Sequence, residues 1–199
     1  GTIDNQGTGT IYVAKDWTNN ATGGSLFASA ASGTVILQTI SQAAVAQNVT
    51  GTRTTNFYNL TFNNSYATTP QYSLGVNISV ANTLTMTQGN MDLTTRDMTL
   101  GASAASPGSL SWAAGWLYGT TGTFTRYFGT GTFAMPTNAT GLFPMGGRNG
   151  AGTLNHYHPF WLAVTAVLAT GGSVSVSHPT TYPLTYDAAA HVDASWGNT

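Results

Sequence analysis

The stretch "NTLTMTQGNMDLTTRDMTLG", residues 82–101, has the most regular pattern in this sequence of 199 residues. Apolar pairs recur in it every seven residues, separated by the turn-like tetrads "TQGN" and "TTRD". The pairs are Leu84 and Met86, Met91 and Leu93, and Met98 and Leu100. Apolar side chains at alternate positions are typical of β-strands, and Gly, Asn and Asp are typical of turns. The stretch therefore predicts very short strands joined by tight turns.

An evenly repeated strand and turn predicts an all-β solenoid. Ile78 and Val80 extend the series upstream, so that Ile78 to Met98 spans three strand–turn units. A right-handed parallel β-helix with three sides per coil has this layout. Leu60 and Phe62 lie eighteen residues before Ile78 and Val80, which predicts another coil there. An antiparallel meander is the alternative. The solenoid is favoured, because three-residue strands form too few cross-strand pairs to stabilise hairpins.

The composition limits the possible partners. Charged residues make up 6% of the chain, glutamate is absent and the net charge is −1, so no electrostatic attraction to nucleic acid is expected. Hydrophobic residues at 41% supply enough apolar surface for a folded core. The sequence has no apolar run long enough to insert into a membrane. Uncharged β-sequence rich in Thr, Asn and Gly is typical of secreted bacterial surface proteins, so we expect an extracellular location.

The composition and the strand pattern of the sequence change near residue 102. Residues 1–102 are expected to form solenoid rungs, and "GASAASPGSL" (residues 101–110) reads as a joint. Aromatic residues and longer strand patterns dominate residues 103–199, which predicts a second β-rich region. This region is either a sandwich or a continuation and widened cap of the solenoid. The final "HVDASWGNT" has no closing signature, so we expect an excerpt of a longer protein.

Several motifs resemble the repetitive regions of large secreted surface proteins of Bacteroidetes. Those proteins carry a W-T-N-N turn, an F-x-N-L-T-hydrophobic-N-N strand and an L-T-L-x-x-G rung, and the matching segments here are residues 17–20, 57–64 and 84–93. The later "GTFTRYFGTGTFAMP" and "LFPMGG" also look like strands of that family. The resemblance departs at "LNHYHPFWLAV", where His158 replaces the more usual arginine. It implies a β-solenoid adhesin or filament exported by the type IX route, and it implies no catalytic residue.

Catalysis is not expected from the acidic residues. β-Helices host polysaccharide-degrading enzymes, and glycosidases need two facing carboxylates. Among the six aspartates only Asp92 and Asp97 are close in sequence, and they lie in successive turns beside Arg96. We interpret both as solvated turn residues.

The segment "HYHP" offers the sharpest candidate for a metal site. In a strand His156 and His158 point to the same face, a spacing that can give two imidazole ligands to one ion. A third ligand would have to come from His178, His191 or Asp187, and none has a spacing that demands it. No metal and no cofactor is therefore expected, and His156 and His158 remain weak candidates.

Aromatic residues offer a candidate for glycan stacking. Trp112, Trp116 and Tyr118 lie among Gly, Ala and Ser, and an exposed row of such rings binds sugars. Burial in the core is the more common fate of such rings.

The sequence thus predicts a non-enzymatic structural or adhesive segment of a bacterial cell-surface protein or filament. Its expected partners are neighbouring copies or domains of the same assembly, with glycans as a further candidate. A carbohydrate-binding module is the alternative, and a polysaccharide-degrading β-helix enzyme is the weaker third hypothesis.

Overall fold

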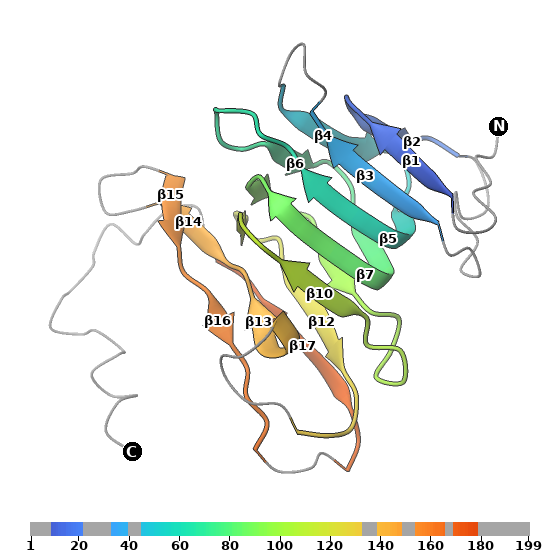
Figure 1. Ribbon diagram of the computed structural model, residues 1–199, viewed down its shortest axis with the longest axis vertical. Helices are drawn as coiled ribbons and strands as arrows, with labels where there is room; N and C mark the ends of the chain where they lie inside the picture. The colour runs from blue at the N-terminus through green and yellow to red at the C-terminus, as the bar shows by residue number, and fades with distance from the viewer. Residues whose placement is uncertain are drawn as a thin grey trace, which may run out of the picture.

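A computed structural model describes residues 9–21, 33–39, 45–132, 139–148, 154–165 and 169–178. Within these ranges the chain is all β apart from one three-residue 3₁₀ helix, η1 (Ala139–Gly141). Parallel strands stack side by side from the N-terminal part of the chain towards the middle, and antiparallel strands follow (Figure 1). The all-β solenoid predicted from the sequence is confirmed, and the antiparallel meander is wrong for residues 45–128.

Two sheets form the coils, and their strands are parallel except for β17 of the larger sheet. The smaller sheet contains β2 (Trp17–Asn19), β4 (Gln47–Gly51), β6 (Tyr72–Leu74), β8 (Met91–Asp92) and β11 (Leu117–Tyr118). The larger sheet contains β1 (Thr10–Val13), β3 (Thr34–Gln38), β5 (Thr55–Asn63), β7 (Ile78–Gln88), β9 (Met98–Leu100), β10 (Ser109–Trp112), β12 (Phe124–Phe128) and β17 (Gly172–Val176).

In the coils that contain β5 and β7, the larger sheet supplies two of the three sides. The register of β5 on β7 shifts after Phe57, which divides both strands into two segments. Strand β9 stacks on the first segment of β7, at Ile78–Val80. Strand β12 then stacks on β9, at Met98–Leu100. Strands β1, β3 and β10 stack with the second segments. Together with the smaller sheet, these two stacks form a three-sided coil.

The seven-residue repeat of the opening stretch places one apolar pair on each side. Ile78 stacks on Met98, which confirms that twenty residues complete this coil. On the other two sides of the coil, Leu84 stacks on Leu110 and Met91 stacks on Leu117. All six members of the three pairs are buried, because alternate positions of each strand face the interior. Tyr72 extends this core by packing on Phe62, with 4.7 Å between ring centroids.

The coil length is not constant, and the predicted position of the preceding coil is wrong. Leu60 and Phe62 stack on Leu84 and Met86, not on Ile78 and Val80. The reason is a long corner between β5 and β6, which adds residues that the even repeat does not contain. The buried Asn64 holds this corner: its Nδ2 donates to the carbonyl of Val45 (2.9 Å), and its Oδ1 accepts from the amide of Tyr66 (2.8 Å).

Parallel stacking continues beyond residue 102 through β10, β11 and β12. Antiparallel pairing begins on the last of these strands, where β17 pairs with β12. Two short antiparallel pairs complete the end: β13 (Leu142–Phe143) with β16 (Phe160–Trp161), and β14 (Gly146–Arg148) with β15 (Leu154–Tyr157). We call the described residues between 139 and 178 the cap. The described part of residues 103–199 thus holds first a continuation of the coil and then the cap.

Candidate functional site

The aromatic residues near the last coil join the coil to the cap. Trp112, half-buried at the end of β10, donates its indole N–H to the carbonyl of Gly115 (2.8 Å). Its ring stacks on Tyr157 of β15, with centroids 5.0 Å apart and planes inclined by 9°. Each ring covers one face of the other, so the two faces that meet cannot receive a sugar.

Trp116 and Tyr118 lie in different environments. The half-buried Trp116 is fixed through its backbone, since its amide donates to Asn90 Oδ1 (3.1 Å). Its indole Nε1 is buried and has no hydrogen-bond partner among the described residues. Tyr118 is only 1% exposed, so the prediction that its ring takes part in glycan stacking is wrong. The physical reason is the cap, because the neighbouring amides of Leu117 and Gly119 donate to carbonyls of Pro144 and His178.

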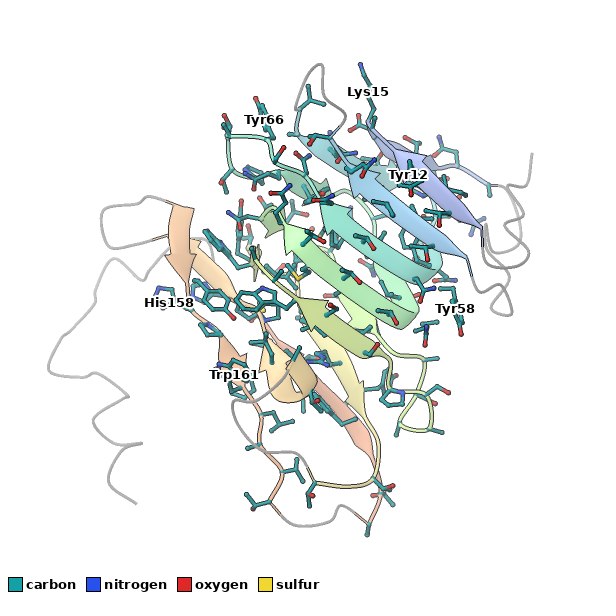
Figure 2. All side chains as sticks on the ribbon, in the orientation of Figure 1. Tyr12, Lys15, Tyr58, Tyr66, His158 and Trp161 are labelled. Carbon is teal, nitrogen blue, oxygen red and sulfur yellow. The ribbon has the colours of Figure 1, made fainter. Side chains whose placement is uncertain are left out.

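Of the candidate histidines, the structure describes the side chains of His158 and His178. His156 lies on β15 opposite Gly147, and its side chain falls outside what the structure describes. The His158 ring lies near that of His178, with centroids 5.6 Å apart. Figure 2 shows His158 at the edge of the cap. The other proposed ligands, His191 and Asp187, lie outside the described residues. Within the described ranges, no three His, Cys, Asp or Glu side chains gather closely enough to hold a metal ion.

The two neighbouring aspartates serve different turns. Asp92, on β8, accepts a hydrogen bond from the amide of Thr94 (2.7 Å). The exposed Asp97 reaches the next coil, where it accepts from the amide (3.1 Å) and hydroxyl (2.8 Å) of Thr123. Each carboxylate therefore satisfies local turn donors, which is the ordinary structural role of aspartate.

Arg126 is a buried cation that the sequence analysis did not single out. It is 3% exposed, and its Nη1 donates to the carbonyls of Ala139 (2.9 Å) and Leu142. The guanidinium carbon also lies 5.4 Å from the ring centre of Phe128 and 5.8 Å from that of Phe143. Burial lowers the pKa of Arg126 to about 10. Strand alternation could have revealed this residue, because it places Arg126 on the inward face together with Phe128.

A cavity of about 400 Å³ adjoins this arginine. The described residues that line it lie in three segments, 107–110, 126–132 and 139–140. Arg126 crosses the boundary between coil and cap and supplies hydrogen bonds to cap carbonyls. Its visible role is to hold η1 and the start of β13 against the last coil.

Comparison with protein-family models, curated proteins and solved structures finds no match to this chain. A search of the described residues for a helix long and apolar enough to span a membrane also finds none.

Proposed function

We propose that this chain is a non-catalytic structural or adhesive segment of an extracellular bacterial surface protein or filament. The observation that carries the proposal is the ladder of uncharged side chains outside the coils. Oxygen atoms of Thr18 and Thr50 lie 3.2 Å apart, and those of Thr83 and Ser109 lie 3.1 Å apart. Such ladders stiffen a coil along its axis and leave a neutral, hydrogen-bonding exterior.

The extracellular location and the type IX export route rest on the composition and on the resemblance to Bacteroidetes surface proteins. In this proposal the partners are neighbouring copies or domains of the same surface assembly, and glycans. The described acidic residues support a role without catalysis, because Asp92 and Asp97 are each engaged by turn donors.

A carbohydrate-binding module is the second candidate, and exposed aromatics on the cap favour it. Phe160 of β16 is 42% exposed, and its neighbour Trp161 is half-buried. Figure 2 places Trp161 on the cap, on the same side as His158. A ring with a free face stacks on sugars, so this candidate needs Phe160, Trp161 or Trp116 to contact a glycan. Loss of glycan binding in Trp161→Ala or Phe160→Ala, with the fold retained, would favour this candidate.

Purified protein incubated with pectin, alginate or xylan should release neither reducing nor unsaturated sugar ends. It should instead self-associate or adhere to a glycan or cell surface. The double variant Asp92→Asn, Asp97→Asn should leave this behaviour unchanged. Reproducible release of sugar ends that disappears in the double variant would overturn the proposal in favour of an enzyme.

A further inference from the structure

One side of the coil carries two regular rows of uncharged side chains, most of which are Thr or Ser. This side, which we call the row face, consists of the outward residues of β1, β3 and β10 and of the second segments of β5 and β7. Figure 1 shows these five strands side by side, running diagonally across the view. The first row is Thr10, Thr34, Asn59, Thr83 and Ser109. The second row is Tyr12, Ile36, Thr61, Thr85 and Ser111.

The two rows differ in how their hydroxyls are used. Hydrogen bonds run along the first row, from Asn59 to Thr34 (3.4 Å) and between Thr83 and Ser109 (3.1 Å). In the second row the hydroxyls of Thr61, Thr85 and Ser111 make no hydrogen bond to another side chain among the described residues. The first row therefore rigidifies the face, and the second row presents hydroxyls to water.

The spacing of these groups is set by the backbone. Neighbouring strands lie about 4.7–4.9 Å apart, and residues two apart along a strand are about 6.6 Å apart. Threonine has a β-branched side chain with few rotamers, so its hydroxyl and methyl groups keep fixed positions. The row face is thus a rigid two-dimensional lattice of mostly hydroxyl and methyl groups, interrupted by Asn59 and, on β1 and β3, by Tyr12 and Ile36.

The chemistry of the face decides which partner fits it. None of its ten residues is Asp, Glu, Lys, Arg or His, so a charged polymer gains nothing there. Sugar-binding faces rely on aromatic rings, and the row face has one, Tyr12, which is 64% exposed on the first strand. A neutral lattice of hydroxyls instead matches a neutral lattice of hydrogen-bonding oxygens, because ordered water can bridge the two with little loss of hydrogen bonding.

We propose that the row face binds crystalline water, so that the coil adsorbs to ice through the rows that contain Thr61, Thr85 and Ser111. This inference rests on the proposed function, since it names the surface to which the coil adheres. Water held by the two rows forms an ordered layer that merges with the ice lattice. The methyl groups of the threonines exclude disordered water from the spaces between the hydroxyls.

Substitutions on two sides of the same coil test this assignment. Thr61→Tyr and Thr85→Tyr each place a bulky ring in the second row. The matched control is Thr99→Tyr, because Thr99 points outward from a different side of the coil, where it pairs with Ser79 and Thr125. Circular dichroism first establishes that all three variants keep the β-fold. The measurements are the shape of ice crystals growing in the protein solution, the gap between freezing and melting points, and capture of labelled protein by growing ice.

The parent protein and Thr99→Tyr should shape ice, hold a freezing gap and enter growing ice. Thr61→Tyr and Thr85→Tyr should lose all three effects. Failure of the parent to affect ice would overturn the inference, and so would equal activity in Thr85→Tyr and Thr99→Tyr. Binding to insoluble cellulose or chitin, or dimerisation through the row face, without any effect on ice would also overturn it while leaving the adhesive function standing. Release of sugar ends would overturn the adhesive function itself.

Discussion

The coil of residues 45–128 and the cap of residues 139–178 provide pairing partners for their strands in different ways. Each inner strand of the coil has parallel neighbours on both edges, one coil before and one coil after. Two or three residues are therefore enough for a strand, as Met91 and Asp92 of β8 illustrate. The cap instead pairs segments far apart in sequence, such as Phe124 with Val176, and buries the charge of Arg126. Repetition thus stabilises the middle of a solenoid, whereas its end requires different contacts.

The largest expected effect comes from breaking the coil. Leu93 is 0% exposed, so Leu93→Asp places an unpaired carboxylate in the core at a cost of several kcal/mol. We expect this variant to be unfolded over residues 78–100, as measured by circular dichroism and urea unfolding. The control Thr95→Asp changes an exposed residue of the same turn and should unfold like the parent. Parent-like melting of Leu93→Asp would show that Leu93 does not lie inside the coil.

A smaller effect, confined to the cap, is expected from Arg126→Ala. The substitution removes the donor to the carbonyls of Ala139 and Leu142, which costs about 1.5–3 kcal/mol for hydrogen bonds from a charged group. Hydrogen exchange should accelerate in β13 and β17 and stay slow in β5 and β7. The exposed Arg96→Ala is the matched control. Equal acceleration in the coil and the cap would mean that Arg126 does not act at their boundary.

Alkaline pH should weaken the coil. Tyr72 donates its hydroxyl to the carbonyl of Leu37 (2.8 Å), and burial raises its pKa far above the ordinary value. The contribution of Tyr72 to the free energy of unfolding is complete below about pH 10, the pKa of an unfolded tyrosine. It is lost as the pH rises further, because unfolding then releases a proton. Arg126 has the opposite effect on stability. Burial lowers its pKa to about 10, so above that pH the folded protein holds the side chain uncharged, and the free-energy cost of burying a charge is relieved.

Urea unfolding at pH values from about 8 to 11.5 measures this balance. The variant Tyr72→Phe should be less stable than the parent at neutral pH, because it loses the hydrogen bond to Leu37. It should also show a shallower decline above about pH 10. A decline of unchanged slope would assign the alkaline effect to other groups, among them Tyr157, whose pKa burial also raises.

The smallest expected effect is that of metal ions. We expect zinc or calcium at modest excess to leave the melting temperature unchanged, because a ligand that binds only the folded state must raise it. The two neighbouring rings of His158 and His178 provide at most two imidazole ligands. A saturable rise that disappears in the double variant His156→Ala, His158→Ala would contradict this expectation.

The sequence predicted the coil better than the cap for a physical reason. The pairs from Ile78 to Leu100 repeat because each side of the coil needs two inward residues, so the sides could be read from the spacing. The preceding register was mispredicted because a long corner follows Phe62, and no local pattern measures how far a corner extends. The cap depends on contacts between distant segments, such as Trp112 with Tyr157 and His158 with His178. Sequence spacing carries no signal for these contacts.

Thr61 and Thr85 are neighbours in one outward row, as both the coil and the proposed ice-binding face require. The chain has no cysteine, so pairs of introduced cysteines report proximity without interference. Strands about 4.7–4.9 Å apart bring such residues within disulfide range. The double variant Thr61→Cys, Thr85→Cys should form an intramolecular disulfide on mild oxidation, detected by mass spectrometry. The variant Thr61→Cys, Ser79→Cys, which represents the eighteen-residue register, should not. A disulfide in the second variant and none in the first would mean that Thr61 does not stack on Thr85 and that the coil and its row face are wrong.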